Sequence, residues 1–135
     1  MLIKVKGKTL LQWSVDSLPL NLCTNLIFIG LEEHEKKYQI SNKIKKLYQN
    51  LSFLKFLFLK ETTRGQAETV LNAINLLEIE KPILIFNIDT YFKSSTLQRD
   101  LKRIDIDGVL GAFTDSSDRF SYAEIDINGN VIKVT

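Results

Sequence analysis

The residues best suited to chemistry lie between Ile83 and Asp89, where an apolar run ends in a carboxylate. Positions 83–88 are apolar except for Asn87, and Asp89 follows them directly. Such a run is typical of a strand buried on both faces of a parallel sheet. Ligands of these sheets bind beyond the carboxyl ends of the strands, where Asp89 could hold a hard cation such as Mg²⁺. An Asp in this place also commonly forms a turn or caps a helix, so both interpretations stay open.

A second polar stretch, Thr62 to Thr69, lies between an expected strand and an expected helix. Gly65 would let the backbone approach a ligand closely. The N-terminus of the following helix offers free N–H groups, which suit an anion or the edge of a base. The same residues also fit a plain loop in which Thr62 or Thr63 caps the helix. Taken together, the two stretches predict a nucleotide pocket with a metal on one wall.

Other kinds of site find little support in the sequence. Neither G-x-x-x-x-G-K-[ST] nor G-x-G-x-x-G occurs, so a phosphate-binding loop is missing. With Cys23 and His34 as the only residues of their types, an internal disulfide and a Cys/His zinc cluster are excluded. Any metal site must therefore use oxygen ligands.

The composition favours one cytoplasmic globular domain over residues 1–135. The hydrophobic fraction of 44% allows a packed core, and the net charge of +2 comes from interspersed charges without a basic stripe. We therefore expect no nucleic-acid partner. No apolar run reaches transmembrane length and no signal core follows Met1, so we expect no membrane partner either.

The elements that must position these residues alternate along the chain. Strands are expected at residues 1–5, 26–30, 53–59, 82–89 and 107–113. Helices are expected at residues 9–18, 32–49, 66–77 and 95–103. Two alternating segments, 122–127 and 131–134, flank the hairpin signal Asn128-Gly129. This order predicts an α/β fold: a three-layer, doubly wound, Rossmann-like mixed sheet, mostly parallel, with a C-terminal antiparallel hairpin.

Four segments resemble the ordered motifs of one family. Residues 5–13 resemble V-x-G-K-P-L-L-x-W, with Thr9 at the usual proline. Residues 63–69 resemble a G-x-A-x-[AST] base-binding loop, and residues 85–89 resemble an L-[VI]-x-[GN]-x-D metal strand. Residues 122–134 resemble a Y-[GA]-x-[VI]-x…G-x-[VI] hairpin. The family is the sugar-phosphate nucleotidyltransferases, with their GT-A-like fold, and the bias is toward bacterial members of capsule and surface-glycan biosynthesis.

The resemblance implies a role for each matching position. Asp89 would be the metal aspartate for Mg²⁺, and Asn87 would lie near the ribose. The residues that would line the base are Gly65, Gln66 and Ala67. The residues that would approach the phosphorylated acceptor through their backbone are Tyr122 and Ala123. The implied partners are a nucleoside triphosphate and a sugar phosphate or small phosphorylated alcohol, whose phosphate attacks the α-phosphorus without a protein nucleophile.

The chain also departs from the family pattern. The family's glycine-rich triphosphate loop would precede Met1, and its second metal carboxylate and phosphate lysine would follow Thr135. We therefore expect a partial domain, truncated at both ends, that is not a competent enzyme in this form. A missing first strand would leave an exposed slot in the sheet, which a second copy could fill as a homodimer.

Two other interpretations remain. The chain could be a non-catalytic α/β interaction or regulatory module, which the missing phosphate loop favours. It could also be an unrelated flavodoxin-like or Rossmann-like domain, which predicts a wholly parallel sheet without the terminal hairpin.

Overall fold

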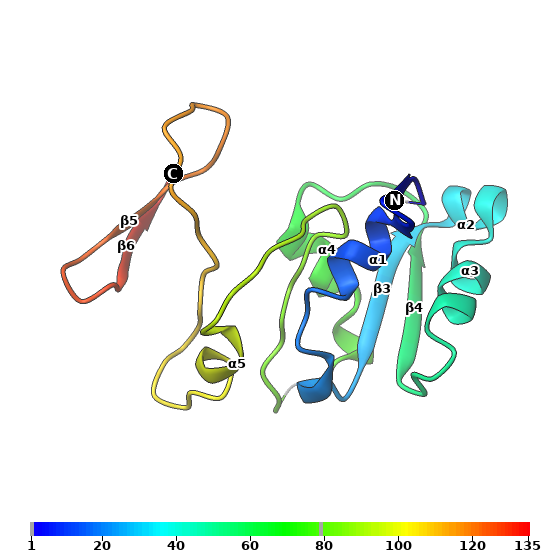
Figure 1. The fold of residues 1–135 in the computed structure, drawn as a ribbon, viewed down its shortest axis with the longest axis horizontal. Helices are drawn as coiled ribbons and strands as arrows, with labels where there is room; N and C mark the ends of the chain where they lie inside the picture. The colour runs from blue at the N-terminus through cyan, green and yellow to red at the C-terminus, as the bar shows by residue number, and fades with distance from the viewer. Residues whose placement is uncertain (1, 79) are drawn as a thin grey trace. The chain divides into compact units, whose positions relative to one another are not determined.

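A computed structural model describes residues 2–78 and 80–135 and divides the chain into two compact units, residues 1–101 and 102–135. The first unit contains a pair of parallel strands with helices beside it, and the second contains a β-hairpin (Figure 1). In these described residues, no helix has both the length and the apolar character needed to cross a bilayer.

The N-terminal segment forms a small hairpin that leads into a capped helix. Strands β1 (Lys4–Val5) and β2 (Lys8–Thr9) pair antiparallel around Lys6 and Gly7, which both have positive φ. Helix α1 (Leu10–Val15) follows, within the expected 9–18, and Thr9 caps it. The Gln12 backbone N–H donates to Thr9 Oγ1 at 3.1 Å, and the Thr9 N–H donates to Gln12 Oε1 at 3.0 Å. This reciprocal capping satisfies two N–H groups that the helix itself leaves unpaired.

The centre of the first unit is a parallel pair of strands. Strand β3 (Leu26–Leu31) pairs with β4 (Leu54–Leu59) over six residues, from Leu26 opposite Leu54 to Leu31 opposite Leu59. The connection between them was expected as one helix over residues 32–49. It is instead two helices, α2 (Glu32–Tyr38) and α3 (Ile40–Leu47). Gln39 has a left-handed backbone with φ of 49°, which ends α2 and turns the chain into α3.

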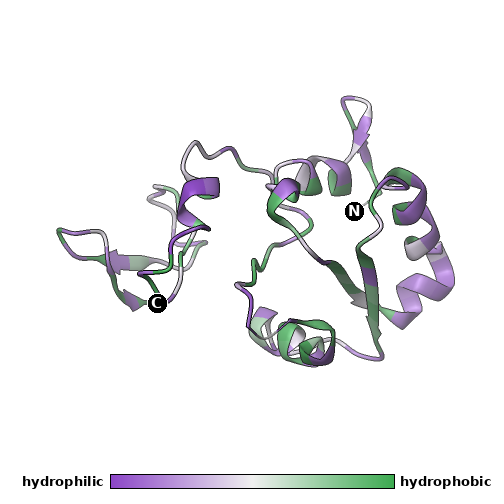
Figure 2. Cartoon of the chain, turned by 90° about the horizontal axis from the view of Figure 1, so that it is seen from below, coloured by the Kyte–Doolittle hydropathy of each residue, from purple (hydrophilic) through white to green (hydrophobic). Residues whose placement is uncertain are grey.

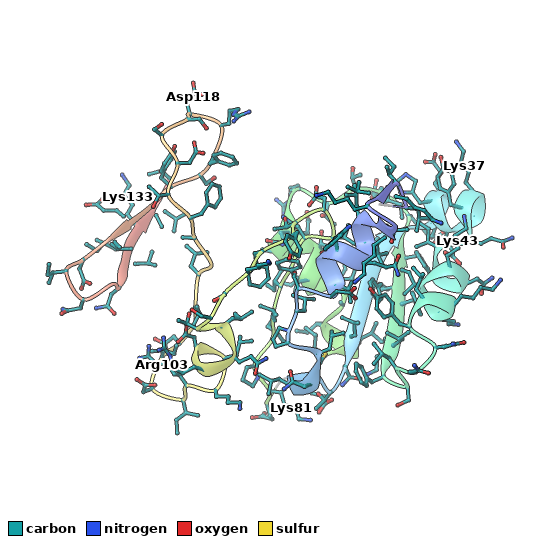
Figure 3. The ribbon with its side chains drawn as sticks, viewed as in Figure 1. Lys37, Lys43, Lys81, Arg103, Asp118 and Lys133 are labelled. Carbon is teal, nitrogen blue, oxygen red and sulfur yellow. The ribbon has the colours of Figure 1, made fainter. Side chains whose placement is uncertain are left out.

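The core lies between α1, β3 and α3. Its buried members are Leu11, Val15, Phe28, Ile40 and Ile44. The rings of Phe28 and Phe56 stack with centroids 5.8 Å apart, which joins the two strands on this face. Figure 2 shows β3 and β4 as mainly hydrophobic and α2 and α3 as mainly hydrophilic. The side chains of Lys37 and Lys43 extend outward from those helices (Figure 3).

The rest of the first unit has little regular structure. Helix α4 (Gln66–Asn72) and a 3₁₀ turn, η2 (Ile74–Leu76), replace the expected helix over 66–77, and η1 (Leu20–Leu22) follows α1. Helix α5 (Leu97–Asp100) is shorter than the expected 95–103. Residues 82–87 form no strand.

The second unit is an open hairpin. Strands β5 (Ala123–Ile125) and β6 (Val131–Val134) pair antiparallel around the Asn128-Gly129 turn, where Gly129 has a φ of +84°. The expected strand at 107–113 is irregular. No residue in 102–135 is buried, and the side chains of Ile104 and Ile127 are fully exposed.

The expected three-layer, doubly wound sheet is therefore wrong. The described residues form three separate two-stranded sheets, one parallel and two antiparallel. The apolar runs at 82–89 and 107–113 have the composition of buried strands, yet no strand in the described part of the chain pairs with either. Composition indicates that a segment suits a sheet, whereas a sheet also needs a backbone partner at the right distance.

Candidate functional site

The segment before Asp89 is held to helix α1 by its backbone. Ser14 Oγ, on a residue that is 2% exposed, donates to the Asn87 carbonyl oxygen at 3.1 Å. The Thr90 N–H donates to the same oxygen at 3.2 Å and closes a turn over residues 87–90. Ile88 packs against the core cluster. The turn that carries Asp89 is thus anchored, although the residues before it are not paired.

A side-chain hydrogen bond joins this turn to the loop before α4. Gln66 Nε2 donates to Asn87 Oδ1 at 2.9 Å. The two residues are 21 positions apart, and each comes from one of the two stretches that the sequence singled out. The structure therefore brings Gln66 and Asn87 together. The remaining amide groups of both side chains make no hydrogen bond among the described residues, so a donor and an acceptor stay available side by side.

The loop itself is organised by its own side chains. Thr63 and Thr69 share a hydroxyl–hydroxyl hydrogen bond of 2.5 Å, and Thr69 Oγ1 also donates to the Gly65 carbonyl at 3.1 Å. Glu68 accepts from the Arg64 backbone N–H at 2.6 Å. A shallow depression lies over this turn, and its lining comprises Arg64, Gly65, Gln66, Ala67, Glu68, Leu71 and Asn72. The backbone of Gly65 is extended, and a methyl group added there would meet nothing within 4 Å.

Asp89 is an exposed carboxylate within the turn. In the part of the chain that the structure describes, no three His, Cys, Asp or Glu side chains gather as a metal site. Mg²⁺ commonly keeps waters and takes only one or two protein carboxylates when substrate phosphates complete its shell. A lone exposed carboxylate such as Asp89 could supply one such ligand.

An aromatic pair beside the turn was not expected from the sequence. Trp13 and Tyr91 meet edge to face with ring centroids 5.5 Å apart, and Trp13 Nε1 donates to the Val5 carbonyl at 2.8 Å. The Lys8 ammonium lies 5.4 Å from the centre of the Trp13 ring. The sequence feature that could have indicated this pair is the position of Tyr91, two residues after Asp89. The pair places an aromatic surface and a cation next to the anchored turn.

The Lys8 ammonium group forms an ion pair with Asp16. Lys8 Nζ lies 2.7 Å from Asp16 Oδ2, and Tyr48 OH donates to Asp16 Oδ1 at 3.3 Å. Burial, together with the neighbouring Asp16 carboxylate, raises the pKa of Tyr48 well above its ordinary value. Tyr48 therefore stays a neutral hydrogen-bond donor to Asp16.

The two residues expected to meet the acceptor belong to the second unit. The Tyr122 N–H donates to the Thr135 carbonyl at 3.1 Å, and the Thr135 N–H donates to the Tyr122 carbonyl at 2.9 Å. Ala123 pairs with Val134 in β5–β6. The Tyr122 hydroxyl donates to the Ser117 carbonyl. The backbone N–H of Tyr122 is therefore used within the hairpin, and the substrate-binding role of Tyr122 and Ala123 stays a prediction.

The assembled group consists of the Gln66–Asn87 amide pair, the Asp89 carboxylate and the Trp13–Tyr91 rings. Amide groups can bond a base edge or a ribose hydroxyl, and a lone carboxylate can hold a phosphate-bound metal. Comparisons with protein-family models, with curated proteins and with solved structures each found no match to this chain.

Proposed function

We propose that this chain binds a nucleoside triphosphate with Mg²⁺ at the Gln66–Asn87 contact, as a nucleotidyltransferase-type domain. The observation that carries the proposal is the 2.9 Å hydrogen bond between these two side chains. It joins the glycine-bearing loop to the turn that carries Asp89, and these are the two stretches that would line the nucleotide. The acceptor would be a sugar phosphate or a small phosphorylated alcohol.

Each group has a part in binding. The free amide groups of Gln66 and Asn87 would bond the base and the ribose, and the backbone at Gly65 and Ala67 would line the base. Asp89 would ligate Mg²⁺, which would offset phosphate charge during attack on the α-phosphorus. The described residues form no cluster of three metal-ligating side chains, and the sequence has no phosphate-binding loop, so we propose binding without turnover for these residues alone.

Isothermal titration with CTP, UTP, dTTP and GTP, each with Mg²⁺, tests the proposal. We expect one nucleotide to bind more tightly than the others. Asp89→Asn should weaken that binding by about 10-fold or more, since a charged contact is worth about 1.5–3 kcal/mol. Asp118→Asn, at an exposed loop residue that points outward in Figure 3, is the matched control.

The amide pair has its own variant. Gln66→Ala should weaken the binding of the same nucleotide, whereas Gln98→Ala, at an exposed position of α5, should leave that binding unchanged. The absence of binding heat with all four nucleotides would contradict the proposal.

A second candidate is a non-catalytic interaction module. It is favoured by the apolar side chains of Ile83, Leu84 and Ile85, which are 43–49% exposed in the first unit. A chain that binds no nucleotide but forms a specific complex would support this alternative.

A further inference from the structure

The strand β3 has a free edge. In the described part of the chain it pairs only with β4, which lies on one side of it (Figure 1). The Leu26 N–H donates to the Phe53 carbonyl, on the β4 side. Because the backbone groups of a strand alternate between its two sides, Phe28 and Gly30 also face β4. The N–H and C=O groups of Ile27 and Ile29 therefore face the free edge.

No residue of β3 is of a type that protects an edge strand against pairing. Residues 26–31 read Leu-Ile-Phe-Ile-Gly-Leu, without a charged residue or a proline. Natural edge strands are commonly protected by lysine, proline or a bulge, whereas an unprotected edge is a template for another strand. The backbone of residues 82–86 makes no hydrogen bond among the described residues, so it does not pair with this edge. Displacing them would break no backbone bond.

We propose that β3 pairs antiparallel with β3 of a second copy, about a twofold axis at Phe28. In this register Ile27 lies opposite Ile29 of the second copy, and Ile29 opposite its Ile27. The N–H and C=O groups of Ile27 and Ile29 on each edge are then used, in four hydrogen bonds.

Two features make a second copy the occupant. The register is self-complementary, which a twofold interface requires. The strand carries no charge, so two identical copies meet on the axis without repulsion. The result is one four-stranded sheet, β4–β3–β3–β4. Sheets of three or more strands reach a stability that a lone two-stranded pair does not.

Light scattering after size exclusion, over a concentration series, tests the proposal on the full chain. We expect the mass to rise from 15.5 kDa to twice that value as concentration increases. Ile29→Pro removes an N–H that β4 does not use, so β3–β4 pairing is kept and the dimer is lost. Ile29→Val keeps the N–H and the branched shape, and should dimerise as the unchanged chain does.

Hydrogen exchange of the unchanged chain gives a second test that needs no folded variant. The amides of Ile27 and Ile29 should become protected as the dimer forms, while that of Phe28 is protected throughout. A monomer at every concentration would overturn the proposal, whether its Ile27 and Ile29 amides exchange rapidly or are protected by another part of the chain. Assemblies larger than a dimer, or a dimer unaffected by Ile29→Pro, would overturn it as well.

Discussion

Replacing Ser14 by alanine tests how the turn that carries Asp89 is held. The Ser14 hydroxyl is buried and donates to the Asn87 carbonyl over 3.1 Å. Alanine fills nearly the same space, so little cavity forms. The carbonyl keeps its second donor, the Thr90 N–H, and is not left unsatisfied. The loss should therefore be that of one ordinary hydrogen bond, about 1 kcal/mol of unfolding free energy.

Urea unfolding followed by the fluorescence of Trp13, the single tryptophan, measures this cost. Hydrogen exchange at Thr90 reports the turn directly and should become faster in Ser14→Ala. Ser17→Ala is the matched control, because its hydroxyl donates to the Ser14 carbonyl within the same segment. If the Thr90 amide exchanges equally fast in Ser14→Ala and Ser17→Ala, or if neither variant changes its exchange rate, α1 does not anchor the turn.

Three further outcomes are expected. Leu11→Ala, at a residue with 0% exposure in the core, should lower the unfolding free energy by about 2–5 kcal/mol in urea titration; a loss well under that range would place Leu11 outside a packed core. Hydrogen bonds from Ser41 hold the pKa of Glu35 in the folded chain below its ordinary value. These bonds therefore stabilise the fold fully above the ordinary pKa of glutamate, and this stabilisation is lost as the pH falls through the pKa of Glu35 in the folded chain. Glu35→Gln should remove this acid dependence of stability, measured by circular dichroism. Hydrogen bonds from Asn130 likewise lower the pKa of Asp126. The NMR signals of the hairpin should therefore be dispersed at pH values above the ordinary pKa of aspartate and should collapse at more acid pH. Asp126→Asn should abolish that transition. A persistent transition in either variant would contradict its assignment.

Local signals in the sequence predicted local structure well. Thr9 predicted the start of a helix, and the structure shows its cap, which Gln12 completes through bonds that span three residues. Asn128-Gly129 predicted the hairpin turn, since glycine adopts the positive φ that the turn needs. The strands at 26–30 and 53–59 were found as a parallel pair with small shifts in their ends.

Long-range pairing was not predictable from the same patterns. The run at 83–88 predicted a buried strand, yet Ile83, Leu84 and Ile85 remain half exposed. A run of apolar residues indicates that a segment suits burial, and it says nothing about which backbone lies next to it. The break at Gln39 was missed for a related reason, because only the backbone angle reveals it.

The candidate site was predicted in part. The sequence singled out Gln66 and Asn87 separately, and the structure joins them by a hydrogen bond. Tyr91 was missed, since one aromatic residue in a loop carries no periodic signal. Tyr122 was chosen through a resemblance, and its backbone is engaged in the hairpin.

Paramagnetic broadening by Mn²⁺ in place of Mg²⁺ tests the proposed nucleotide site most directly. The chain is titrated with the Mn²⁺ complex of its best nucleotide while backbone amide signals are followed by NMR. Our account predicts that the amides of Asp89 and Thr90 broaden first, that those of Gln66 and Ala67 follow, and that Asp89→Asn removes the effect. Uniform broadening of all exposed acidic positions, or broadening confined to residues 102–135, would contradict it.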